Sequence, residues 1–162
     1  MRKTGLAPIV DDRTTLLLLG SLPGDASLKA TQYYAHPQNA FWRLIGRVLG
    51  QDLHALAYPD RVEALGVAGV GLWDVIASAD RAGSLDAAVR TPEAADLNGL
   101  IAGLPRLKTV AFNGALAARN GRRSLGERAD LTLIDLPSSS PAHARPFEQK
   151  AAIWDRLALT LR

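Results

Sequence analysis

The sequence predicts an α/β fold, a three-layer α/β/α sandwich in which helices cover both faces of a central, mainly parallel sheet of four strands. Four short apolar runs have the length of buried strands, and segments with helical spacing of apolar residues lie between them. The 162 residues contain no repeat, low-complexity tract or linker. Because that length suits one ordinary domain with a sizeable core, we expect residues 1–162 to form a single domain.

The candidate strands are apolar without alternating polar residues, which is typical of parallel strands buried on both faces. They are Leu16–Leu19, Val67–Val75, Thr109–Phe112 and Leu131–Leu136. Residues 76–90 carry no pattern that favours either a helix or a strand.

Helical spacing of apolar residues is clear from Phe41 to Leu49, and the following Gly50 suits a C-terminal stop. Thr91 and Pro92 resemble an N-cap followed by proline at the first helical position. A helix is therefore expected to begin there and to continue through Leu97, Leu100, Ile101 and Leu104.

The last helix is expected to begin at Pro146, since proline is common at the first helical position. Within it, Lys150 and Arg156 are predicted to face water. The apolar side chains predicted to cover the sheet are Phe147, Ile153, Trp154, Leu157 and Leu161.

The composition excludes several kinds of chemistry. The chain has no cysteine, which rules out disulfides, thiolate metal ligands, iron–sulfur clusters and a cysteine nucleophile. The histidines, His36, His54 and His143, lack the spacing of a metal site, and neither a GxGxxG nor a Walker loop is present. We therefore expect no metal and no cofactor.

Charge and hydropathy limit the choice of partners. A formal net charge of +3 favours a polyanion without identifying one. The N-terminal sequence lacks an apolar signal core, and no apolar run is long enough to span a bilayer. We expect no membrane association and a cytoplasmic protein, associated with the nucleoid in a bacterium.

Three polar segments follow predicted strands. The first is the turn Gly20-Ser21-Leu22-Pro23-Gly24-Asp25 with its extension through residues 33–42, the second is Phe112-Asn113-Gly114, and the third is 136–145. The carboxyl ends of parallel strands meet at one edge of a sheet, where open α/β folds bind ligands. The three segments are therefore expected to meet in one site.

Together these segments resemble the uracil-DNA glycosylase superfamily. The stretch HPQNAFW, residues 36–42, is similar to the HPxNxFW element of its mismatch-specific branch, and GSLPG, FNG and LPSSSPA are most similar to the hypoxanthine-DNA glycosylase branch. The resemblance covers residues 14–145 in order. It implies the superfamily's α/β/α fold and an enzyme that flips a damaged base out of DNA and hydrolyses its bond to the sugar.

The resemblance implies a catalytic role for Asn39, which maps onto the asparagine used by the hypoxanthine branch. An amide is too weakly basic to be a general base, so Asn39 is expected to position the attacking water. Leu22 stands where the superfamily often has Asp or Asn, and leucine cannot position water. Taken alone, Asn39 reads as an N-cap before Ala40, and the two roles are compatible.

Base binding is expected from Gly20, Ser21, Tyr34 and Asn113. Gly20 allows a nucleotide to approach closely because glycine has no side chain. Tyr34 matches the aromatic residue on which the base stacks, a contact worth about 1–3 kcal/mol per base. Asn113 offers NH2 and C=O groups that complement the edges of hypoxanthine and uracil. Without the resemblance, Tyr34 is a core residue and Asn113 a turn residue before glycine.

The loop before the last helix is expected to grip the opened DNA strand, because its hydroxyls and basic end suit phosphate. Its DNA-binding residues are Ser138, Ser139, Ser140, Pro141, His143 and Arg145. His143 departs from the hypoxanthine branch, which more often has asparagine after SPA. Loops of this composition otherwise often only connect elements.

Supporting roles are expected for Pro23, Gly24, Asp25 and His36. His36 lies close to Tyr34 in sequence and could favour departure of the base electrostatically, but a lone histidine in a loop is more often structural than catalytic. A basic run is expected either to be a solvated face or to add non-specific affinity for DNA. It comprises Arg119, Arg122, Arg123 and Arg128.

The expected partner is double- or single-stranded DNA containing deaminated bases, bound by a monomer. Two other interpretations remain open. Ser139 or Ser140 with His143 and Asp25 would form the triad of a serine hydrolase, although no GxSxG elbow is present. A DNA-binding homologue with weak or no turnover is the other, and Leu22 suggests it. The residues do not rank hypoxanthine, uracil and xanthine.

Overall fold

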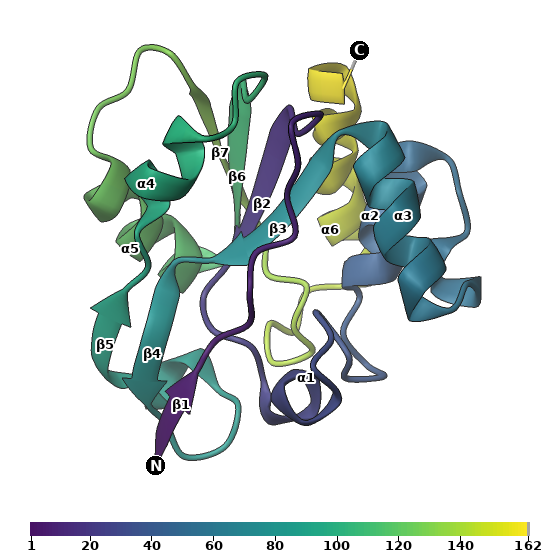
Figure 1. Cartoon of the computed structure of the whole chain (residues 1–162). Coiled ribbons are helices and arrows are strands. Elements are labelled where there is room, and N and C mark those ends of the chain that lie inside the picture. Colours follow the sequence, from purple (N-terminus) through teal and green to yellow (C-terminus); the bar gives the residue numbers. More distant parts are fainter. Residues whose placement is uncertain (162) are drawn as a thin grey trace.

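A computed structural model describes residues 1–161 and confirms the predicted fold class (Figure 1). Its main sheet has four strands in the order β3-β2-β6-β7, and each neighbouring pair is parallel. The strands are β2 (Leu16–Gly20), β3 (Val70–Asp74), β6 (Thr109–Asn113) and β7 (Thr132–Leu136). All four predicted runs therefore contain a strand, although residues 67–68 of the second run belong to the preceding helix.

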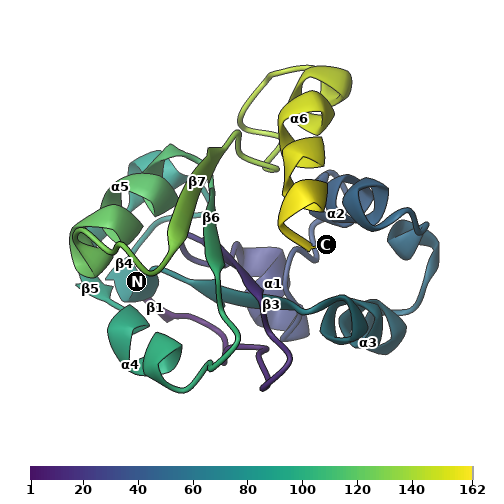
Figure 2. The same cartoon turned by 90° about the horizontal axis from the view of Figure 1, so that it is seen from above.

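Helices cover both faces of this sheet, because alternate residues of its buried strands face opposite sides. Leu16 and Leu18 pack with one cluster, and Leu17 and Leu19 pack with the other. Figure 2 shows the two helical layers on either side of the sheet. The first layer is α2 (Phe41–Leu49), α3 (Tyr58–Ala68) and α6 (Phe147–Trp154), and the second is α4 (Leu97–Ala102) and α5 (Ala115–Leu125).

Short elements complete the fold. They are α1 (Asp25–Ala30) and the 3-10 turns η1 (Leu53–Ala55), η2 (Asp86–Ala88) and η3 (Asp155–Leu161). The helix predicted from Phe41 ends as expected at Gly50, which adopts a left-handed conformation with φ of 69°. No helix among residues 1–161 is long and apolar enough to cross a membrane.

A second, antiparallel sheet takes one of its strands from residues 76–90, where the sequence showed no pattern of helix or strand. It has the strand order β1-β4-β5 and is formed by β1 (Arg2–Thr4), β4 (Ile76–Asp80) and β5 (Arg90–Ala94). The expected helix start at Thr91 is therefore wrong, because Thr91 and Pro92 lie on the exposed edge strand β5. Proline is tolerated at such an edge. The helix begins after Asp96, whose side chain accepts the backbone N–H of Gly99.

The prediction that Lys150 faces water is also wrong. Lys150 is only 4% exposed, and its ammonium group donates to the carbonyl of Ser140 at 3.1 Å. The side chain is long enough to lie along the apolar surface and still reach a polar acceptor. Arg156 is exposed, as predicted, and Trp154 and Leu157 are buried in the core.

The order of the parallel strands determines where a ligand can bind. From β2 the chain crosses to β3 on one side, and it then returns to β6 on the other side of β2. The connections thus diverge between β2 and β6, which creates a crevice at the carboxyl ends of these two strands. Gly20 and Asn113 end those strands.

Candidate active site

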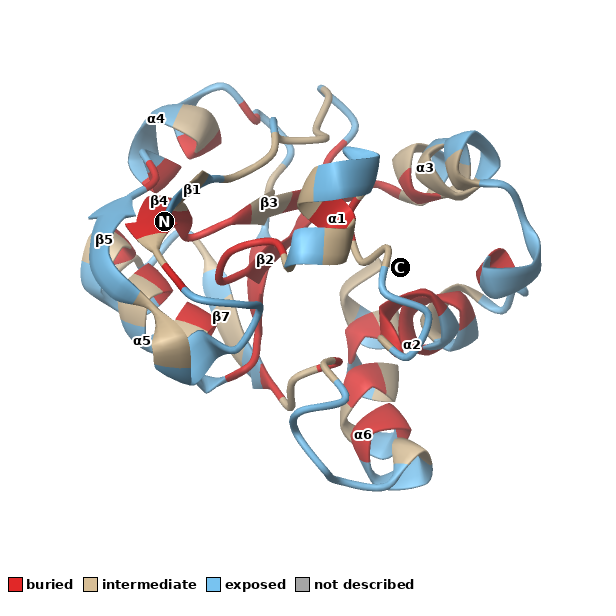
Figure 3. Ribbon diagram, turned by 90° about the horizontal axis from the view of Figure 1, so that it is seen from below, coloured by how far each residue is buried: buried red, intermediate tan, exposed pale blue. Residues whose placement is uncertain are grey.

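A cavity of about 590 Å³ lies at this crevice. Figure 3 views the molecule from this side, with α1 over the carboxyl ends of the buried strands. All three segments singled out in the sequence contribute to its lining, together with residues 84–87 and Asp74. Residues 20–24, 33–34, 113 and 138–140 therefore meet, as predicted.

The space beside Gly20 forms a polar niche in this cavity. A side-chain carbon added at Gly20 would lie 2.6 Å from Asp74 Oδ1 and 3.0 Å from the Tyr34 hydroxyl. Those separations are shorter than ordinary contacts, so only glycine leaves the two polar groups undisturbed. Gly20 thus leaves space open beside Asp74, an acid that the sequence analysis did not single out, and the close approach of a nucleotide at Gly20 stays a prediction.

Asp74 is the last residue of β3 and is 5% exposed. Its Oδ2 atom is inaccessible to solvent and has no hydrogen-bond partner among residues 1–161. Burial raises the pKa of Asp74 to about 7, and the charge of Asp86 adds to the rise while Arg81 opposes it. Near neutral pH this carboxyl group therefore titrates between its neutral and charged forms.

Tyr34 presents its ring to the cavity from a left-handed backbone conformation with φ of 55°. The ring stacks on Phe41 with centroids 3.9 Å apart and planes 13° apart. Its hydroxyl oxygen is enclosed and has no hydrogen-bond partner within the described residues 1–161. Burial, reinforced by the charge of Asp74, raises the pKa of Tyr34, so this hydroxyl stays protonated.

Asn113 and Ser139 form a reciprocal pair within the cavity wall. The Asn113 amide donates to Ser139 Oγ at 2.9 Å, and its oxygen accepts the Ser139 backbone N–H at 2.9 Å. Both residues are buried. Each end of the amide keeps one further hydrogen-bonding site, so the pair does not exhaust the capacity of Asn113.

Asn39 lies beside this pair without lining the cavity. Its side-chain oxygen accepts the backbone N–H of Phe41 at 3.0 Å, which is the local capping contact read from the sequence. The next residue, Ala40, donates its backbone N–H to the carbonyl of Ser139 at 3.0 Å. That bond joins the Asn39 segment to the wall that carries Asn113.

A buried arginine holds the Gly20–Gly24 turn in shape. Arg81 is 1% exposed and donates to the carbonyls of Leu22, Pro23 and Gly83 at 3.4, 2.7 and 2.7 Å. Asp25 lies 3.6 Å from this guanidinium group and 2.5 Å from Lys3. The carboxylate of Asp25 is thus committed to the support of the turn, and Asp25 does not line the cavity.

The opposite end of the turn contacts η2. Ser21 donates its hydroxyl to Asp86 Oδ1 at 2.6 Å, and both residues line the cavity. Leu22 is 6% exposed and packs in the core between the main sheet and α4, so its side chain supplies no polar group. Pro23 and Gly24 line the cavity.

Two side chains of α6 hold the first part of the 137–146 loop by hydrogen bonds. Lys150 holds the carbonyl of Ser140, and Trp154 donates its indole N–H to the carbonyl of Pro137 at 3.0 Å. His143 lines the cavity, and partial burial together with Lys150 and Arg145 lowers its pKa. Pro141 and Arg145 are exposed, and Arg145 lines an adjoining groove of about 580 Å³.

The amino end of α5 also opens onto the cavity. Ala115 and Leu116 line it, and the preceding Gly114 has no side chain to cap the helix. Gly114 has φ of 100°, and an added carbon there would lie 3.1 Å from Ser138 Cβ. The free backbone N–H groups and the helix dipole favour negative charge at this end of the cavity.

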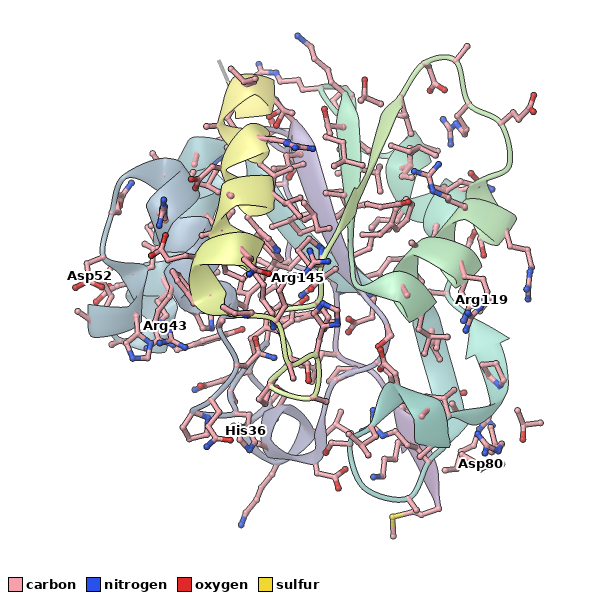
Figure 4. All side chains as sticks on the ribbon, turned by 180° about the vertical axis from the view of Figure 1, so that it is seen from behind. His36, Arg43, Asp52, Asp80, Arg119 and Arg145 are labelled. Atoms are coloured by element: carbon pink, nitrogen blue, oxygen red, sulfur yellow. The ribbon has the colours of Figure 1, made fainter. Side chains whose placement is uncertain are left out.

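The basic residues divide into paired and available groups. Arg122 pairs with Asp135 and Arg128 with Asp130, so both are held on the outer face. Arg119 instead lines both the cavity and the adjoining groove. In the view of Figure 4, Arg145 lies between Arg43 and Arg119. Arg119 and Arg145 give the mouth of the site a positive charge.

The triad of the alternative serine-hydrolase interpretation does not form. The Ser139 hydroxyl is engaged by Asn113, the Ser140 hydroxyl accepts from Ala142, and Asp25 is bound to Lys3. His36 is exposed, lies outside the cavity lining and accepts the Gln38 backbone N–H on its Nδ1 atom. Within residues 1–161, no three histidine, aspartate or glutamate side chains gather as metal ligands would.

Sequence reasoning missed Asp74 and Asp86, which line the cavity, and Arg81, which holds the adjoining turn. Asp74 follows an apolar run and ends a strand, and that position was a usable signal. Arg81 and Asp86 carried none, because they lie in the stretch without a periodic pattern and reach the site through the second sheet.

Comparisons with known proteins agree with this geometry. A family model described as the uracil DNA glycosylase superfamily matches residues 7–158. Hypoxanthine DNA glycosylase of Methanosarcina barkeri (strain Fusaro / DSM 804) is 38% identical over 156 residues, which cover 95% of this chain and 96% of the relative. The protein of the same name from Methanosarcina acetivorans is 36% identical over 157 residues, covering 96% and 97%.

A solved structure is equally similar. The solution NMR structure of a candidate uracil DNA glycosylase from Methanosarcina acetivorans matches with a TM-score of 0.86 and 36% sequence identity, and the match covers 99% of each chain. Fold, crevice and sequence therefore agree along nearly the whole chain, and the chain belongs to the uracil-DNA glycosylase superfamily.

Proposed function

We propose that this protein is a monofunctional DNA glycosylase that flips a deaminated base out of DNA and hydrolyses its N-glycosidic bond, with hypoxanthine as the preferred base. The observation that carries the proposal is the cavity at the β2–β6 crevice, built from the segments that resemble the hypoxanthine branch. The similarity to two hypoxanthine DNA glycosylases supports the choice of base.

The bound base would stack against Tyr34, whose other neighbour is Phe41. Asn113 would read the base edge with the N–H and the lone pair that Ser139 leaves free. Ser21 and the open side of Gly20 would contact the base at the turn. A base that has lost its amino group presents a carbonyl oxygen to these donors.

Hydrolysis requires little from the protein beyond positioning and electrostatics. The electron pair of the glycosidic bond leaves with the base, the oxygen of water bonds to the sugar carbon, and the proton released by that water passes to solvent. Asn39 would hold the water against the sugar, and the amino end of α5 would favour the negative charge on the base. The product is an abasic site, and strand cleavage is not expected.

DNA would approach across the mouth of the cavity. Arg119, Arg145, Ser138 and Ser140 would bind phosphates on either side of the extruded nucleotide, while Ser139, which is buried and held by Asn113, would support this loop from within. We further propose that the protein acts as a single domain and as a monomer, and that it meets its substrate in the cytoplasm.

The test is single-turnover excision by the purified protein on duplexes and single strands that carry inosine, uracil or xanthine. We expect excision from inosine to be fastest. Replacement of Asn39 by alanine should lower the rate by about 100-fold or more if the residue positions the water. A protein that binds these DNAs but excises no base is a binding homologue, which would reject the proposal.

Asn39 also caps a helix, so a second variant separates catalysis from stability. Asn39→Ser keeps a side-chain oxygen that caps well but lacks the carboxamide. It should retain thermal stability and lose excision as Asn39→Ala does. Gln38→Ala removes a carboxamide from the adjacent exposed position and should leave the rate unchanged.

A further inference from the structure

Asp74 is a buried acid in the base-binding cavity that no step of the proposed reaction has used. It ends β3, lines the cavity and faces the niche beside Gly20. Its Oδ2 atom is enclosed and has no partner among residues 1–161. A buried polar group without a partner is costly, and the other carboxyl oxygen of Asp74, Oδ1, faces the open niche beside Gly20, where a ligand can form a hydrogen bond with the carboxyl group.

The groups around Asp74 disfavour its charged form. Burial disfavours it most, and Asp86 of η2 adds a like charge, while the protonated Tyr34 hydroxyl borders the same niche. Arg81 is the opposing charge, but it directs its hydrogen bonds to Leu22, Pro23 and Gly83. Arg119 and His143 lie in the same cavity lining.

We propose that Asp74 acts as a neutral carboxylic acid that donates a hydrogen bond to a carbonyl oxygen of the flipped base and thereby stabilises the charge that forms as the base departs. The inference rests on the proposed glycosylase function and deepens it. A neutral carboxyl group has an O–H donor, whereas a carboxylate only accepts and would repel a carbonyl oxygen.

This assignment explains how the site favours a deaminated base. Deamination replaces an amino group, which donates, with a carbonyl oxygen, which accepts. As the glycosidic bond breaks, negative charge spreads onto that oxygen, and the Asp74 hydrogen bond becomes stronger. Asp74 keeps its proton, and the departing base is later protonated by solvent. The protonation state of Asp74 therefore controls both recognition and rate.

The decisive experiment is the pH profile of single-turnover excision from an inosine duplex. The pKa of Asp74 is about 7, so the wild-type rate should fall about tenfold per pH unit above that value. Asp74→Asn keeps a neutral N–H donor at every pH, and its profile should be flat between pH 6 and 9. Asp74→Ala removes the donor without adding bulk to the niche and should lose about 100-fold at pH 6.

Two variants identify the titrating group. Asp86→Asn preserves an acceptor for Ser21 but removes the charge that raises the pKa of Asp74, so the falling part of the profile should move to lower pH. His143→Gln removes the imidazole in the lining and should leave the fall in place, because the pKa of His143 is lowered from 6.5 and lies below this range.

Thermal unfolding gives a readout that does not depend on activity. The folded pKa of Asp74 lies above the unfolded value of 3.8, so between these values the folded protein holds a proton that the unfolded chain has released. The contribution of this group to the free energy of unfolding is therefore complete below pH 3.8 and is lost as the pH rises to about 7. Asp74→Asn has no such group. Its melting temperature should therefore rise relative to the wild type between pH 5 and pH 8.5.

The outcomes separate the two proposals. If the wild type excises no base at any pH, the proposed function fails and this inference fails with it. If the wild type excises inosine but Asp74→Asn keeps the same falling profile, only the role of Asp74 is rejected. A rate that instead rises with pH through 7 in the wild type alone would identify Asp74 as a base and would also reject the inference.

Discussion

Gly20 is the residue whose size most tightly constrains the cavity. Its missing side chain leaves the space between the Asp74 carboxyl and the Tyr34 hydroxyl open. Asp74 Oδ2 and the Tyr34 hydroxyl oxygen are enclosed, and neither has a hydrogen-bond partner among residues 1–161. The niche therefore combines the room and the hydrogen-bonding groups that a base edge requires.

Replacement of Gly20 by alanine should block this niche. The new methyl group would lie 2.6 Å from Asp74 Oδ1, so the carboxyl group must move, and overpacking of this kind costs about 1–3 kcal/mol. We expect single-turnover excision to fall at least about tenfold while binding to a product duplex with an abasic site persists, since only the base position is filled.

Gly24→Ala is the matched control in the same turn. Its backbone φ is −68°, and its added carbon would meet Ser84 Oγ at 3.4 Å, an ordinary contact. Excision by this variant should stay close to the wild-type rate. An equal loss in both variants would attribute the effect to the turn as a whole rather than to the niche.

The sequence best predicted which residues line the cavity where those residues end or follow a buried strand. Gly20, Ser21 and Asn113 all line the cavity, as their positions indicated. Lys150 was misread because spacing along a helix gives the face of a residue but not what lies over that face. Here the 137–146 loop covers it and accepts its hydrogen bond.

At the element scale, the second sheet acts as a support for the main site. Arg81 follows β4 and carries its charge to the carbonyls of the Gly20–Gly24 turn. β1 adds a further contact, because Lys3 donates to Gly83 at 2.6 Å and to Asp25 at 2.5 Å. The turn is thus held by the second sheet, whose strand β4 also packs Ile76 and Ala79 into the core.

Arg81→Met should expose the importance of this support. The variant leaves buried carbonyl oxygens without donors, and each such group costs about 1–3 kcal/mol. We expect the free energy of unfolding, measured in urea, to drop by about 3 kcal/mol or more, with a matching loss of base binding. Arg106→Met, at an exposed position outside the site, should change stability by about 0.5 kcal/mol at most.

Elements that pack both faces of the parallel sheet were readable because apolar periodicity reports burial. The prediction of a helix start at Thr91 was wrong because it relied on a local signal instead. A threonine–proline pair is compatible with an edge strand as well as with a helix N-terminus. No local rule distinguishes the two. The outcome depends on pairing between β5 and β4, which only the folded chain supplies.

The strand order of the whole molecule determines where the site lies. The distribution of basic side chains determines how we expect DNA to bind. The crevice follows from the crossovers on either side of β2. The net charge of +3 is small, so affinity depends on where basic side chains are free rather than on their number. Arg119 and Arg145 border the site, whereas Arg128 is engaged by Asp130.

Salt dependence of binding to an undamaged duplex measures this distribution. Each phosphate contact changes the slope of log affinity against log salt concentration by about 0.9 for duplex DNA. Arg119→Ala and Arg145→Ala should each reduce the slope by about 1. Arg128→Ala should leave it unchanged, and an equal reduction in all three variants would indicate a diffuse field instead of two contacts.

The cavity is assembled from stretches of chain that lie far apart in sequence. Its lining begins at Gly20 and is not complete until His143. During synthesis, the early turn and the middle wall therefore leave the ribosome well before the loop that closes the site, and such distant contacts form late in folding. A nascent or truncated chain that ends before that loop has no enclosed slot for a base, so we expect base hydrolysis to begin only after the loop has been synthesised and has packed onto the earlier segments.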